Sequence, residues 1–175
     1  MTANQSSKKL GINYVTVKKS FHLFRGLIAN HLEEEYKDTT VLEYDEYIYL
    51  QQSKKKIKEN IFDAQNFLSF HYENRIYNLL MPNLSRYKQE FLDAGAQEAY
   101  FKEFSKFMML NKISKTQKRE NIITKFWIFF EEEILKYKGV SDENFFYYLK
   151  EIEFKFNYTK EEQTQILKAS LYKYF

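Results

Sequence analysis

Residues 119–157 constrain the fold more than any other stretch, because they encode two amphipathic helices in direct succession. The first helix is expected over residues 120–138, and its apolar face contains Trp127, the only tryptophan of the chain. Gly139 is expected to end it, and Ser141 to cap the next helix. The apolar face of that second helix carries Phe145, Tyr148, Leu149, Ile152 and Phe156. Two such faces require a shared core.

The composition narrows the class of protein. Aromatic residues make up 19% of the 175 residues, a load of apolar surface that favours a packed core over disorder. The absence of cysteine excludes disulfides and thiolate metal sites, and four glycines with one proline exclude a glycine-rich phosphate loop. No apolar run is long enough for a membrane span and no secretory signal is recognisable, so we expect a cytoplasmic protein with no membrane partner. The net charge of +3 permits nucleic-acid contact without requiring it.

Residues 39–82 have the pattern of a β-meander. Residues 39–50 alternate as a strand does, and residues 66–72 and 75–82 read as two strands around the turn Glu73-Asn74. Within the first strand, Asp45 and Glu46 are adjacent acids that must point to opposite faces. At least one of them therefore faces the packed side or a sheet end, where a carboxylate is either paired or functional.

Residues 6–36 predict a short helix, a turn at Gly11 and a long helix whose apolar stripe is Val17, Phe21, Phe24, Ile28 and Leu32. The opposite face carries Lys18, Lys19, His22 and Arg25. This pattern occurs in DNA-binding helix-turn-helix segments, but by itself it favours an ordinary two-helix corner with a solvated basic face. The same two interpretations, phosphate contact or solvated charge, apply to the lysines of the connection 51–65, which are Lys54, Lys55, Lys56 and Lys58.

Two further helices complete the prediction. Residues 84–118 are expected to be helical with a break near Ala94-Gly95, and their stripe of Tyr100, Phe101, Phe104, Phe107 and Met108 is interpreted as core. Thr159 and Glu162 form a capping box for a last helix that continues to about Tyr174. The fold class is therefore α+β, with a three-stranded meander flanked by helices.

Taken in order, these segments resemble the DDE transposases of bacterial insertion sequences, specifically the ISXO-like branch. The resemblance rests on residues 10–17 with 21–25 (LGINYVTV, FHLFR), 43–47 (EYDEY), 75–83 (RIYNLLMPN) and 121–157, where NIITKFW, KGVS and LKEIEFKFN keep the family's spacing. It implies a helix-turn-helix-like DNA-binding segment over residues 1–38 and an RNase-H-like transposase domain over residues 39–175. DNA is then the expected partner, at the nucleoid, and a homo-oligomer is compatible with the family.

The resemblance also identifies a depleted set of catalytic residues. Asp45 matches the metal-binding Asp of the first strand, Asp93 is the one candidate for the second Asp, and Asn121 belongs to the active-site pattern. The third acid is replaced by Thr124, and Glu131 stands where the family has a phosphate-contacting lysine. Two-metal phosphodiester chemistry needs several acids around one point, so we expect a remnant or domesticated transposase that binds DNA without cleaving it and needs no cofactor.

Two alternatives stay open. An active enzyme would use Asp45, Asp93 and Glu131 with Mg²⁺ or Mn²⁺, and a non-enzymatic protein would reuse the same core for protein interaction.

Overall fold

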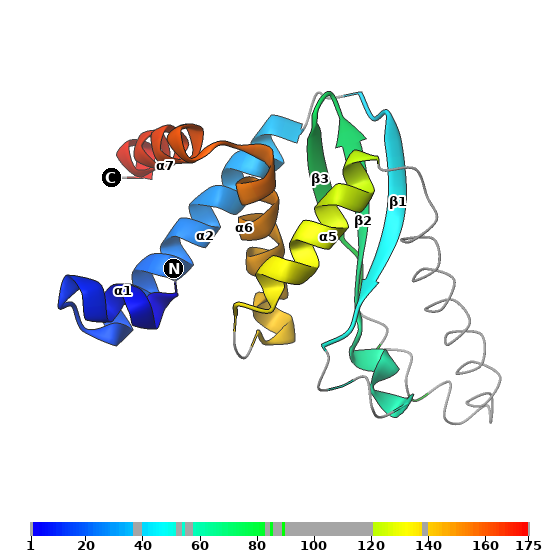
Figure 1. Ribbon diagram of the computed structural model, residues 1–175, viewed down its shortest axis with the longest axis horizontal. Coiled ribbons are helices and arrows are strands. Elements are labelled where there is room, and N and C mark those ends of the chain that lie inside the picture. The colour runs from blue at the N-terminus through cyan, green and yellow to red at the C-terminus, as the bar shows by residue number, and fades with distance from the viewer. Residues whose placement is uncertain are drawn as a thin grey trace.

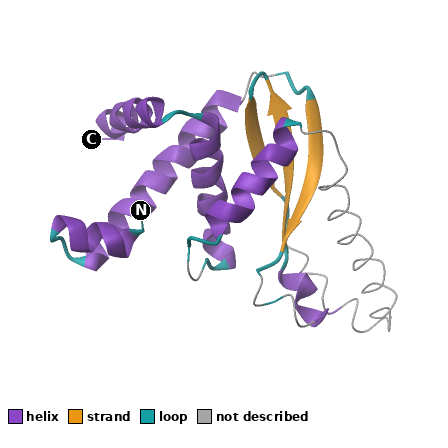
Figure 2. Ribbon diagram, viewed as in Figure 1, coloured by secondary structure: helices purple, strands orange, loops and turns teal. Residues whose placement is uncertain are grey.

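The computed structural model describes residues 2–36, 40–51, 54, 58–82, 85, 89, 121–137 and 140–174. These residues form a mixed α+β fold in which a three-stranded antiparallel sheet lies beside a group of helices (Figures 1 and 2). The predicted α+β class is therefore confirmed. The helix predicted over residues 84–118, including Asp93, lies almost entirely outside the described residues.

The N-terminal corner consists of α1 (Ala3–Leu10) and α2 (Tyr14–Tyr36). Gly11 has a φ of +65°, a left-handed conformation that glycine adopts without strain, so the predicted role of this residue in the turn is confirmed. The Asn13 side chain then accepts the backbone N–H of Val15 at 2.8 Å, which satisfies a free donor at the start of α2. In the predicted apolar stripe, Val17, Ile28 and Leu32 are buried, whereas the two phenylalanines are half-buried.

The sheet has the strand order β1-β2-β3, with β1 spanning Glu43–Tyr49, β2 Gln65–Tyr72 and β3 Arg75–Leu80. The predicted meander and its Glu73-Asn74 turn are confirmed, although β1 begins at residue 43 rather than 39. A short 3₁₀ helix, η1 (Lys58–Asp63), precedes β2. The register places Asp45, Ser69 and Asn78 side by side across the three strands.

Helices α5 (Ile122–Ile134) and α6 (Phe145–Asn157) are the two helices predicted around Trp127. The details at their junction differ from the prediction. Helix α5 ends four residues early, and the 3₁₀ turn η3 (Asp142–Asn144) separates Ser141 from α6. The Ser141 hydroxyl makes no capping bond to the backbone and instead accepts the Asn144 side-chain amide at 2.8 Å.

The core between α5, α6 and the sheet is aromatic. Phe130, which is fully buried, has ring contacts with Tyr47 and Phe67 from the sheet and with Phe145 from α6. Such pairs add to the free energy gained by burying the rings. This core fixes which face of β1 is covered: Tyr47 is part of it, so Asp45, two residues earlier, lies on the same face.

A second cluster joins the N-terminal and C-terminal helices. Ile28 and Leu32 of α2 pack with Phe154 and Tyr158, and α7 (Lys160–Tyr174) contributes half-buried side chains at the edge. The predicted capping box of α7 is confirmed, since Glu162 accepts the Thr159 backbone N–H at 2.8 Å and Thr159 accepts that of Glu162 at 3.4 Å. None of the helices in the described part of the chain is long and apolar enough to cross a membrane.

Candidate nucleic-acid interface and carboxylate site

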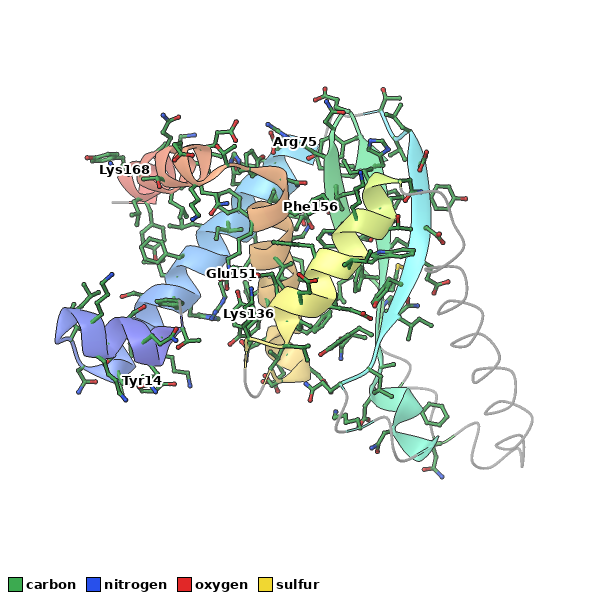
Figure 3. All side chains as sticks on the ribbon, viewed as in Figure 1. Tyr14, Arg75, Lys136, Glu151, Phe156 and Lys168 are labelled. Atoms are coloured by element: carbon green, nitrogen blue, oxygen red, sulfur yellow. The ribbon has the colours of Figure 1, made fainter. Side chains whose placement is uncertain are left out.

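The corner formed by α1 and the first turns of α2 projects away from the sheet and from α5 (Figure 1). Tyr14 lies at its far end in Figure 3. The side chains of Lys18, Lys19 and His22 are exposed there, as predicted for a solvent-facing surface. Lys8 and Lys9, in the last turn of α1, are exposed as well and add to the same corner.

Charge is distributed unevenly along the chain. Residues 1–32 contain five Lys or Arg and no Asp or Glu, whereas the remaining residues contain 22 Lys or Arg against 24 Asp or Glu. The N-terminal segment therefore carries +5 and the rest −2. This asymmetry is visible in the sequence. It could have identified Lys8 and Lys9 as part of the basic corner, which the helical pattern alone did not do.

Arg25 differs from the other candidate DNA contacts, because its guanidinium points into the protein. Its Nε donates to Glu151 Oε2 at 2.7 Å, and the group lies over the Tyr148 ring, 4.0 Å from the centroid. Glu151 also accepts Lys155 Nζ and the Tyr137 hydroxyl, both at 2.7 Å. Burial raises the pKa of Glu151, but Lys155 and Arg25 outweigh it and hold the pKa below its usual value. Arg25 thus joins α2 to α6 and is not presented to a phosphate.

Of the four candidate lysines after β1, only Lys54 and Lys58 belong to the described residues. Lys54 pairs with Asp63 of η1, with 3.2 Å between Nζ and Oδ2. Lys55 and Lys56 lie outside the described residues, and Lys58 is the first residue of η1.

The candidate catalytic residues are divided between the two ends of α5. Asn121 caps its N-terminus: the side-chain oxygen of Asn121 accepts the Thr124 N–H at 2.8 Å, and its side-chain amide donates to Glu43 Oε2 at 3.1 Å. Glu131 lies ten residues further on, about 15 Å along the helix axis. The structure thus brings Asn121 to β1, where Asp45 shares a face with Glu43, but it does not bring Glu131 to the same end.

Glu131 has a structural partner of its own, because it accepts a hydrogen bond from the Tyr47 hydroxyl. Burial raises the pKa of Tyr47, and the hydrogen bond to Glu131 raises it further, so the phenol stays protonated. Asp45 accepts the backbone N–H of Glu46 at 2.9 Å, and both acids are half-buried. Within the described residues, no three His, Asp or Glu side chains are grouped so that they could hold a metal ion. Asp93, the remaining candidate acid, lies outside the described residues.

A buried polar chain crosses the core from α5 to α2. The Trp127 Nε1 donates to Ser69 Oγ at 3.0 Å, and Ser69 in turn donates to Asn78 Oδ1 at 2.6 Å. Asn78 donates through its backbone N–H and its side chain to Glu153 Oε2, both at 2.9 Å.

This row of hydrogen-bonded side chains ends at Lys150, whose side chain has no exposed surface. Lys150 Nζ lies 3.4 Å from Glu153 and 3.0 Å from Glu33 of α2, and 3.7 Å from the centre of the Tyr77 ring. Desolvation raises the pKa of the fully buried Glu153 to about 7, against the opposing effects of Lys150 and Asn78. No pattern of the sequence distinguishes these two residues from the solvated lysines and glutamates around them.

The chain matches no protein-family model, no curated protein and no solved structure.

Proposed function

We propose that the protein is a transposase-derived DNA-binding protein that no longer cleaves DNA. The observation that supports DNA binding is the projecting corner of α1 and α2, in which Lys8, Lys9, Lys18 and Lys19 are exposed on a segment without acidic residues. Contacts between lysines and phosphates supply most of the affinity of a non-specific complex. The second half of α2 is anchored on α6, so the corner is carried by the core of the protein.

The loss of cleavage is supported by the separation of the carboxylates. An RNase-H-like domain, which the proposal includes, needs acids from the first strand and from the later helix at one point. The meander with Asp45 on the face that α5 covers is compatible with that arrangement. Thr124, however, stands at the position of the helical acid, and Glu131 is bound to Tyr47 at the other end of α5.

DNA binding is expected to be steeply dependent on salt. If the four corner lysines each contact a phosphate, affinity for a mixed-sequence duplex should fall about 150-fold between about 50 and 200 mM salt. The double variant Lys18→Ala/Lys19→Ala should weaken binding about tenfold and reduce the slope of log K against log salt by about 1.8. Fluorescence anisotropy with a labelled duplex measures both quantities.

The matched control is Lys168→Ala/Lys173→Ala, which removes two exposed lysines from α7 at the same cost in net charge (Figure 3 labels Lys168, far from Tyr14). This control should retain the affinity and the salt slope of the unmodified protein. Equal losses in the two double variants would mean that net charge, and not the corner, binds DNA.

Incubation with Mg²⁺ or Mn²⁺ is expected to leave duplex DNA uncut and unjoined, including DNA that carries terminal inverted repeats. Gel analysis of end-labelled substrate measures this directly. The control is Asp45→Ala: a cleavage activity that this substitution abolishes would establish an active enzyme and contradict the proposal.

A protein-interaction module is the second candidate, favoured by apolar exposure at the same corner. Leu10, Ile12, Tyr14 and Val15 are 45–61% exposed, which is unusual for large apolar side chains so close together in sequence. The absence of any duplex binding even at low salt would support this function over the first.

A further inference from the structure

Among the described residues, strand β3 lies at an edge of the sheet, and α6 meets its outer side. The two segments lie side by side in Figure 1, and side chains of α6 bind the backbone of β3. In an antiparallel sheet, backbone groups point alternately toward and away from the neighbouring strand. Ile76 and Asn78 are two residues apart, and the groups that α6 binds belong to these two residues.

The bonds reproduce those that a neighbouring strand would make. The Ile76 N–H donates to Asn157 Oδ1 at 2.9 Å, and the Ile76 carbonyl accepts Asn157 Nδ2 at 2.6 Å. The primary amide of Asn157 thus offers one acceptor and one donor to the same residue, as a peptide group does. The next outward N–H, that of Asn78, is bound by Glu153, which precedes Asn157 by one helical turn.

An unprotected β3 would be well suited to pair with another strand. Its sequence RIYNLL contains no proline and one charge, and that charge, Arg75, is paired with Glu35. Strands of this kind are templates for edge-to-edge association. Two copies of one strand can pair antiparallel about a two-fold axis, because each residue then meets its counterpart reciprocally.

We propose that Asn157 and Glu153 act as a side-chain substitute for a fourth strand, and that they block antiparallel pairing of β3 with β3 of a second copy of this chain. This device is independent of DNA binding. It adds two side chains of α6 to the apolar contacts that hold this helix against β3.

The test compares Asn157→Leu, which removes donor and acceptor at similar volume, with Asn157→Asp, which keeps the acceptor and loses the donor. The matched control is a substitution of Ile152, a buried α6 residue in the aromatic core, by Val or Ala, whichever gives the Tm closest to that of Asn157→Leu. Light scattering after size exclusion gives the mass at protein concentrations up to about 100 μM, where exposed edges associate.

Because the chain has no cysteine, the substitution Leu79→Cys, added to each variant, can report on the contact itself. Leu79 is the exposed residue beside Asn78 on β3, and oxidation should link two copies through the introduced thiol faster where their β3 strands meet than where the thiols meet only by collision. We expect Asn157→Leu to dimerise or form larger species and to cross-link through that thiol. Asn157→Asp should do so to a lesser degree, and the Ile152 variant should keep the mass of the unmodified protein.

Two results would overturn the proposal. One is that Asn157→Leu keeps the mass of the unmodified protein and cross-links no faster than it at the highest concentration. The other is that the Ile152 variant of equal Tm associates to the same extent, which would assign the association to general destabilisation. If Asn157→Leu does not fold, the comparison of Asn157→Asp with an Ile152 variant of equal Tm decides between the same outcomes.

Discussion

At about pH 9, where the carboxyl of Glu153 is ionised in the unmodified protein, replacing Lys150 by Met is expected to lower the free energy of unfolding by about 3 kcal/mol, because the buried carboxylate loses its counter-charge and must stay unpaired or take up a proton. Neither Lys150 nor Glu153 has any exposed side-chain surface. Methionine matches the length and the apolar stem of the lysine, so the substitution leaves no large cavity. The loss is therefore electrostatic, and chemical denaturation measures it.

The double variant Lys150→Met/Glu153→Gln separates the charge effect from packing. It removes both charges and keeps an acceptor for the Asn78 N–H, which would otherwise be left unsatisfied. Glu33 retains the hydroxyl of Tyr77 at 2.7 Å and is 43% exposed, so water can solvate it when the lysine is absent. Because buried ion pairs contribute little net stability, this variant should unfold within about 1.5 kcal/mol of the unmodified protein. A double variant as unstable as Lys150→Met would show that lost packing dominates.

The stability of the unmodified protein is expected to fall by about 3 kcal/mol as the pH rises from about 4.5 to above 7. The cause is Glu153, whose pKa is raised by burial from 4.5 to about 7 in the folded protein. Below pH 4.5 the folded and unfolded states both hold the proton. Between the two values the unfolded state has released it and the folded state retains it, so each rise in pH favours unfolding. Above the folded pKa the difference is complete.

Urea denaturation at closely spaced pH values measures this slope, and Lys150→Met/Glu153→Gln is the control, since it has no titrating group at position 153. Its stability should change little across the same interval. A second group acts in the opposite sense at lower pH: Glu151 has a lowered pKa, and its contribution is lost as the pH falls below the ordinary range of a glutamate. Parallel pH profiles for the double variant and the unmodified protein would exclude Glu153 as the source.

The elements that the sequence predicted well depend on local physics. Gly11 at the first turn and the Thr159–Glu162 box at the start of α7 act within a few residues, and each was located from residue type and spacing. The periodicity of residues 145–156 likewise predicted the face of α6 that meets the aromatic core. Asn121 lies where the Trp127 helix was expected to begin, but its partner Glu43 is 78 residues away and no local pattern indicates it.

Arg25 and Lys150 show where sequence reasoning fails. Both lie outside the predicted apolar stripes of their helices, and such positions are normally solvated. Helix α6 is covered on two sides, by α5 and the sheet and also by α2, so its polar residues at 150, 151 and 153 face protein. Their burial depends on which element covers the second side of the helix, and that is a long-range property.

The sequence by itself determined the α+β class, the meander, the helix pair around Trp127 and the exposure of Lys18 and Lys19, because periodicity, turn residues and caps act over short distances along the chain. Only the tertiary structure decided that Arg25 joins α2 to α6, that Glu131 and Asn121 lie at opposite ends of α5, and that Asn157 occupies the edge of β3. Each of these contacts joins segments that are distant in sequence. Its partner is therefore fixed by how the elements pack, which the local pattern of residues does not encode.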